Sequence, residues 1–211
     1  MDLKVLGIAG VAKVGKDTFC AHVIKLLEEK GFKSKRLAFA DELKNDLKDF
    51  LLAKTGVNVY TTDPVSKESI RPLMVEYGKL MREMTKGKYW VNKVKQEVEN
   101  NFKNKFISII SDVRYPNEAS WINSIDGGIT IHLTRNGILP ANTEEAEQDP
   151  LVQKESKLLL NWPNLSEKLI QHQSLEHLNE ITQNLSENRP RTSSLSSRKS
   201  KQRASTKRAN I

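Results

Sequence analysis

The residues with the most recognisable chemistry stand near the start of the chain, where glycines and a lysine follow the spacing G-x-x-x-x-G-K. The pattern extends from Gly10 to Lys16. Glycines let the backbone wrap so that successive N–H groups point inward. The following helix adds its positive end, and the lysine reaches the β and γ phosphates of a nucleotide. We therefore predict an ATP-binding loop, the alternative being a tight turn before a helix. Its predicted residues are Gly10, Lys13, Gly15, Lys16, Asp17 and Thr18.

The position after the lysine departs from the usual pattern. A Ser or Thr normally stands there and binds magnesium, whereas this chain has Asp17 and only then Thr18. Mg²⁺ must then be held differently, through Asp17 or through a water. A second carboxylate, Asp112, follows an apolar stretch, where it could orient magnesium or its waters. The alternative for Asp112 is a helix cap or a turn residue.

Strand-like and helix-like segments alternate around these residues. Apolar, β-branched runs predict strands at 4–9, 34–40, 106–111 and 128–134. Apolar residues at helical spacing predict helices at 16–30, 41–53, 70–86, 90–102, 117–125 and 175–185. We expect a polar, acidic segment up to Gln153 and a weakly helical region after it. The alternation predicts an α/β fold with a mostly parallel sheet and ligands at the carboxyl ends of its strands.

Positive charge is the main requirement of phosphoryl transfer to a phosphate acceptor, because such an acceptor is already a nucleophile at neutral pH. The predicted catalytic residues are Lys16, Arg82, Arg114 and Arg135, and Arg71 is a further candidate for phosphate contact. The alternative to a phosphate contact is, for Arg82, a surface ion pair with Glu83 or Glu76 and, for Arg114, an ion pair with Glu118. Asp41 either contacts the acceptor or caps the helix that begins there. Trp90 either stacks on a base or is a core aromatic.

Several motifs stand out in the sequence: Gly15-Lys16-Asp17-Thr18, Phe39-Ala40-Asp41 with Lys44, Tyr77-Gly78 with Arg82 and Trp90, and Asp112-Val113-Arg114-Tyr115-Pro116-Asn117-Glu118-Ala119. Together they resemble one family, the deoxynucleoside monophosphate kinases of bacteriophages. The similarity covers roughly residues 3 to 185, and the closing segment Leu175-Glu176-His177-Leu178 adds to it. One departure is the segment after Arg135, which lacks the histidine that the family often carries there.

The resemblance implies a P-loop nucleoside monophosphate kinase with a three-layer core in residues 1–185. It implies a helical monophosphate-binding insertion at about 56–103 and a lid at about 135–156. ATP, Mg²⁺ and a nucleoside monophosphate would be its ligands. The implied substrate-binding residues are Asp41, Lys44, Arg71, Arg82, Trp90 and Asp112, and the implied metal-binding residues are Asp17 and Asp112.

The net charge of +8 is concentrated in the tail at 186–211, which has eight Lys or Arg residues against one Glu. That is a net +7, so the remaining residues carry +1. The composition of the tail predicts disorder and suits weak polyanion binding, and a solubilising extension is the alternative. We expect a cytoplasmic protein, that of a phage-infected bacterium if the resemblance extends so far, with no membrane span. We expect Cys20 and the four histidines to be structural.

Two other functions stay open at this stage. One is another small-molecule kinase of the same fold, such as one that acts on dephospho-coenzyme A. The other is a nucleotide-gated nucleic-acid-binding protein in which the loop acts as a switch. The nearly neutral globular part favours a small-molecule site over a nucleic-acid channel. The base and sugar of the acceptor, and whether the protein is a homodimer, are not determined by the sequence.

Overall fold

The computed structural model describes residues 3–162 of the chain. The helix predicted at 175–185, the basic tail at 186–211, His172 and His177 lie outside the described residues. Within that part of the chain, no helix combines the length and the apolar character that crossing a bilayer requires.

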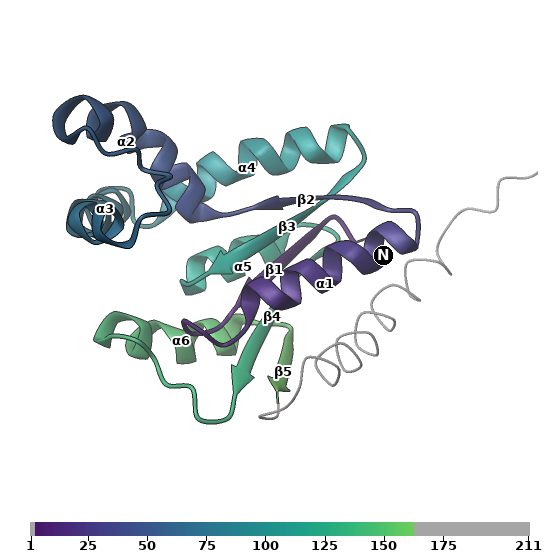
Figure 1. The fold of residues 1–211 in the computed structure, drawn as a ribbon. Helices are drawn as coiled ribbons and strands as arrows, with labels where there is room; N and C mark the ends of the chain where they lie inside the picture. Colours follow the sequence, from purple (N-terminus) through teal and green to yellow (C-terminus); the bar gives the residue numbers. More distant parts are fainter. Residues whose placement is uncertain (1–2, 163–211) are drawn as a thin grey trace, which may run out of the picture.

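A five-stranded parallel sheet forms the centre of the molecule, in the strand order β2-β3-β1-β4-β5 (Figure 1). The strands are β1 (Val5–Ala9), β2 (Lys33–Leu37), β3 (Phe106–Val113), β4 (Gly128–Arg135) and β5 (Leu158–Trp162). The helices are α1 (Lys16–Glu29), α2 (Phe39–Thr55), α3 (Pro64–Met84), α4 (Lys88–Lys103), α5 (Pro116–Ser124) and α6 (Thr143–Glu155). The predicted α/β class with a mostly parallel sheet is confirmed.

The two faces of the sheet bury separate apolar clusters, which gives three layers. On one face, Phe19, Val23 and Leu27 of α1 pack against strand residues such as Ile8 and Ile109. On the other face, α4, α5 and α6 cover strand residues that alternate with the first set. Adjacent residues of β1 point to opposite faces, because side chains alternate along a strand. The apolar run that predicted this strand is therefore buried on both sides.

The segment predicted as a helical insertion contains α3 and α4. α2 and α3 lie at one end of the sheet (Figure 1), and α4 packs on both of these helices and on β3. Leu47, Leu51, Val59 and Ile70 form a small apolar cluster there. Asp46 of α2 connects the three helices, because its carboxylate accepts hydrogen bonds from Tyr77 of α3 and from Tyr89 and Lys93 of α4. The insertion therefore has its own apolar and polar anchors.

Three parts of the predicted element pattern were wrong. The second strand ends at Leu37 rather than residue 40, and its helix begins at Phe39. No residue of the edge strand β2 is buried, so the apolar pattern of the sequence did not indicate where this strand ends. The third helix begins at Pro64, where Asp63 caps it, rather than at residue 70.

The largest error of the prediction lies between residues 136 and 162. An irregular segment and a weak helix were predicted there, whereas the structure has α6 and the edge strand β5. Only Val152 of α6 is buried, so the helix has almost no apolar face to recognise. The available signal was its N-terminus, where Asn142 caps the helix and an acidic residue stands three positions later, at Glu145.

Candidate active site

The predicted phosphate loop joins β1 to α1 and has the backbone conformation that its glycines allow. Gly10, Lys13 and Gly15 have φ angles of 128°, 64° and 109°. At Gly10, a Cβ atom would lie 2.4 Å from the carbonyl oxygen of Leu133. Only glycine fits this position, because it combines a positive φ with close contact to a neighbouring strand.

Lys16 lies at the base of this loop. Its Nζ atom donates to the carbonyl oxygens of Gly10, at 2.6 Å, and Val11, at 2.8 Å. Burial and the nearby Arg114 guanidinium lower the pKa of Lys16, while Glu145, Asp17 and Asp112 oppose that shift. The fold therefore brings Lys16, Arg114 and Asp112 into one electrostatic environment.

The first turn of α6, which falls in the predicted lid, contacts the loop directly. Glu145 accepts hydrogen bonds from the N–H of Ala12, at 2.8 Å, and from the N–H of Ala141, at 2.7 Å. The neighbouring Glu144 accepts a bond of 2.5 Å from the Tyr115 hydroxyl. The Glu145 carboxylate thus accepts a hydrogen bond from one of the backbone amides of the predicted loop. Neither Glu144 nor Glu145 was among the site residues predicted from the sequence.

The body of α6 is anchored on the sheet side. Asp149 lies 2.9 Å from Nε2 of the fully buried His132 of β4, and Asn123 of α5 donates to the Glu155 carbonyl. This contact gives His132 the structural role that we expected. The α6 segment of the predicted lid is therefore docked on the core.

A cleft of about 540 Å³ lies between the insertion and the sheet. One face of α3 lines it along most of its length, with residues at the three- and four-residue spacing of a helix. Its cations are Lys44, Lys67, Arg71, Lys79, Arg82 and Arg114, and its carboxylates are Asp112, Glu118 and Glu144. Apolar side chains such as Phe39, Leu43 and Met74 form other parts of its wall.

The cleft lies beside a smaller cavity at the predicted phosphate loop. A small cavity of about 50 Å³ touches Gly10, and four residues line both this cavity and the larger cleft. The shared residues are Arg114, Tyr115, Asn142 and Glu144. A molecule in the cleft would therefore lie next to a nucleotide held by the loop.

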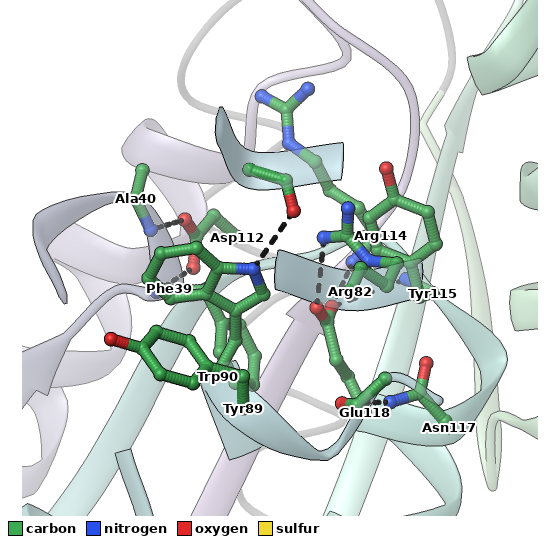
Figure 2. A network of polar contacts seen from close by, with 12 residues as sticks. Phe39, Ala40, Arg82, Tyr89, Trp90, Asp112, Arg114, Tyr115, Asn117 and Glu118 are labelled. Atoms are coloured by element: carbon green, nitrogen blue, oxygen red, sulfur yellow. Dashed lines mark hydrogen bonds and ion pairs between the residues drawn. The ribbon is translucent and has the colours of Figure 1, made fainter. Parts of the chain in front are cut away.

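Both oxygens of Asp112 bind the start of α2 (Figure 2). They accept from the N–H of Phe39, at 2.8 Å, and the N–H of Ala40, at 2.9 Å. Burial raises the pKa of the Asp112 carboxyl, against the effect of these two donors. This geometry matches the capping alternative, although Asp112 caps a helix that lies far away in the sequence.

Arg82 pairs with neither Glu83 nor Glu76, the two partners in the alternative interpretation. Its Nη2 atom lies 3.8 Å from Oε1 of Glu118, and its guanidinium carbon lies 3.4 Å from the centre of the Tyr115 ring (Figure 2). Its side chain is 24% exposed and lines the cleft. The alternative pairing of Arg82 with Glu83 or Glu76 is therefore wrong, and the predicted phosphate contact of Arg82 stays a prediction.

Glu118 is 2% exposed and forms the centre of this group. Its Oε2 atom accepts from the N–H of Arg114, at 2.9 Å, and from the N–H of Tyr115, at 3.2 Å. Arg114 thus contacts Glu118 through its backbone, while its side chain lines the cleft. Burial raises the pKa of Glu118 to about 7.

Two predicted substrate residues have positions that argue against their proposed contacts. Trp90 is 2% exposed and donates to the Gly78 carbonyl, so it is a core aromatic and base stacking is not supported. Asp41 pairs with Arg36 and Lys44 and does not line the cleft. It also does not cap its helix, because the N-cap position is Ala38.

Arg135 also lies outside the cleft. It ends β4 beside the loop strand, and residues 3–162 provide no polar partner for its guanidinium. Its predicted lid or ATP contact therefore stays a prediction. Lys44, Arg71, Arg82 and Arg114, by contrast, all line the cleft.

Magnesium would fit this site only together with a nucleotide. The described residues contain no group of three or more His, Cys, Asp or Glu side chains placed to hold a metal. Kinase Mg²⁺ ions commonly use one or two carboxylates plus substrate phosphates and water, so no such group is required. Asp17 and Thr18 are exposed beside the loop, and each oxygen of Asp112 has a lone pair beyond its amide bond. These residues fit a magnesium ion that a triphosphate brings with it.

No family model and no curated protein matches the chain. Among solved structures, shikimate kinase from Acinetobacter baumannii in complex with shikimate is 13% identical, with a TM-score of 0.44, and covers 86% of this chain and 94% of its own. Shikimate kinase from Bacteroides thetaiotaomicron is 10% identical, with a TM-score of 0.41 and coverages of 85% and 98%. A Thermus thermophilus protein is 14% identical, with a TM-score of 0.47 and coverages of 90% and 100%. Likenesses this weak decide neither the acceptor nor the reaction, and the resemblance to the phage kinases stays a prediction.

Proposed function

We propose that this protein is a P-loop kinase that transfers the γ-phosphoryl group of ATP to a (deoxy)nucleoside monophosphate. The observation that carries the proposal is the cationic cleft, which adjoins the small cavity at Gly10 of the predicted phosphate loop. Six cationic side chains line it against three carboxylates, and Asp112 and Glu118 are already hydrogen-bonded within the protein. The lining of the cleft therefore carries more positive than negative groups, which suits a phosphate-bearing acceptor.

In the proposed reaction, an acceptor phosphate oxygen attacks the γ phosphorus, the bond from that phosphorus to the bridging oxygen of ATP breaks, and ADP leaves. Lys16 and the loop amides would hold the donor phosphates, and Mg²⁺ would neutralise part of their charge. Arg82 and Arg114 would hold the acceptor phosphate and stabilise charge on the transferred group. Arg114 lines both the cleft and the small cavity at Gly10, and Arg82 lines the cleft and stacks on Tyr115, which lines both.

A hydroxyl acceptor, as in a dephospho-coenzyme A kinase, would place a further demand on this cleft. Such an acceptor must lose a proton during the transfer, which favours a free carboxylate or imidazole as base. All three cleft carboxylates accept hydrogen bonds from protein donors, Glu144 from Tyr115. A monophosphate needs no such base, because it is ionised at neutral pH.

A coupled ADP-release assay across the common ribo- and deoxynucleoside monophosphates tests the proposal, with shikimate and dephospho-coenzyme A as competing acceptors. Lys16→Ala should lower turnover on the order of a hundredfold to a thousandfold, because a preorganised charge contact to the transferred group is lost. Thermal unfolding serves as the folding control. Turnover with a hydroxyl acceptor alone, or unchanged turnover in folded Lys16→Ala, would contradict the proposal.

A further inference from the structure

Glu118 is a buried carboxylate that the proposed transfer does not use directly. Its side chain is 3% exposed, and the Arg82 side chain that faces it is 24% exposed. A charge buried to this degree is costly unless specific partners hold it. Its partners therefore indicate why the fold places a glutamate here.

Those partners belong to both sides of the cleft. Oε1 pairs with the guanidinium of Arg82, which comes from α3 of the insertion. Oε2 accepts from the N–H groups of Arg114 and Tyr115, where β3 leads into α5. One side chain thus fixes an insertion arginine relative to the backbone that carries the second cleft arginine.

Tyr115 completes the support of Arg82. The guanidinium lies 3.4 Å from the centre of the Tyr115 ring, and the Tyr115 hydroxyl donates to Glu144 of α6. Stacking restricts the plane of the guanidinium, and the ion pair restricts its rotation within that plane. Figure 2 shows Arg82, Tyr115 and Glu118 meeting in this way.

We propose that Glu118 is a positioning residue that orients Arg82 and the Arg114 turn toward the phosphate of the acceptor. This inference rests on the proposed function. Glu118 itself does not touch the acceptor, because its two oxygens already face Arg82 and the backbone amides. Its effect on transfer passes through the two arginines.

Glu118→Gln is the informative change, because glutamine keeps the shape and lacks a second acceptor oxygen. Its NH₂ group must face either Arg82 or the two backbone N–H groups, and each of these is a donor. We expect kcat/KM for the acceptor to fall roughly tenfold to a hundredfold, while KM for ATP stays within about twofold. Glu83→Gln is the matched control, since Glu83 is exposed on the same helix next to Arg82 and should leave the kinetics unchanged.

The double variant with Arg82→Lys separates positioning from a general loss of structure. Arg82→Lys keeps the charge but loses the planar fork, so it should also weaken acceptor kinetics. If Glu118 acts through Arg82, the double variant should lose much less than the product of the two single losses. If Glu118→Gln does not fold, Glu118→Asp keeps the charge on a shorter arm and should show the same selective loss.

The outcomes are distinct. Selective loss of acceptor kinetics with a non-multiplicative double variant supports the positioning role. If the wild type is active and folded Glu118→Gln keeps its acceptor kinetics, the positioning role is wrong and the proposed function is unaffected. The same conclusion follows if Glu118→Gln loses kcat/KM equally for ATP and for the acceptor. Wild-type protein that transfers no phosphoryl group to any monophosphate overturns the proposed function and this inference together.

Discussion

The buried carboxyl of Glu118 also predicts how stability depends on pH. Its ordinary pKa is 4.5, and burial raises the folded-state pKa to about 7, despite the amide bonds and Arg82. Between these values the folded protein holds a proton on Glu118 that the unfolded chain has lost. Ionisation of Glu118 therefore destabilises the fold as pH rises through this window.

The size of the effect follows from the shift. Each pKa unit corresponds to about 1.4 kcal/mol, so the pH-dependent cost at Glu118 is about 3 kcal/mol, and most of it should develop between pH 5 and 8. Glu118→Gln removes this titration. Any penalty from a misplaced amide would be the same at every pH, so it shifts the curve without changing its slope.

Urea unfolding of the wild type and Glu118→Gln at pH 5 and pH 8 tests this prediction. The difference in unfolding free energy, variant minus wild type, should grow by about 2 to 3 kcal/mol over that range. The nearest charged groups, Arg82, Asp112 and Arg114, are present in both proteins, so their own contributions largely cancel in the difference. Parallel curves for the two proteins would refute the conclusion that burial destabilises the Glu118 charge.

Two further predictions concern the phosphate loop and the packing of the sheet. Glu145→Gln should lower KM for ATP on the order of threefold to tenfold, because the carboxylate on the Ala12 amide repels and competes with a phosphate. Weaker ATP binding would mean instead that Glu145 supports the loop, and Glu147→Gln, at an exposed position of the same helix, is the control. Gly128→Ala should destabilise the fold by about 3 kcal/mol in chemical denaturation, because its Cβ would lie 1.9 Å from the carbonyl oxygen of Ile122. A loss below about 1 kcal/mol would show that the β4 entry can shift.

Local patterns in the sequence predicted the parts of the fold that depend on local chemistry. The strand, glycine loop and helix around Lys16 follow one another without a gap, and each has its own signal. The segment around α6 and β5 has no comparable signal. Pro150 stands inside α6, and Leu159 of β5 is 57% exposed. These elements are stabilised by contacts with distant residues, such as that between Asp149 and His132.

For the candidate site, too, the sequence did not predict contacts between residues that are distant in the chain. Charge and helix position were enough to propose that Arg82 and Arg114 face an acceptor. The pairing of Arg82 with Glu118 could not be predicted, because the two residues are far apart in the chain and come together only in the folded protein. Trp90 shows the opposite error. An aromatic in a predicted insertion could stack on a base, but the packing of α3 on α4 buries it.

The run from Asp112 to Ala119 connects the start of α2 and the predicted insertion to the carboxyl end of β3. Asp112 binds the start of α2, Asn117 donates to the Gly87 carbonyl between α3 and α4, and Glu118 pairs with Arg82. Two points of the predicted insertion and the start of α2 are therefore fixed to one short segment at the carboxyl end of β3. Because β3 lies beside β1, which leads directly into the predicted phosphate loop, the same segment sets the position of Arg82 relative to that loop. Substitutions in this run should therefore impair acceptor alignment even where they touch no ligand.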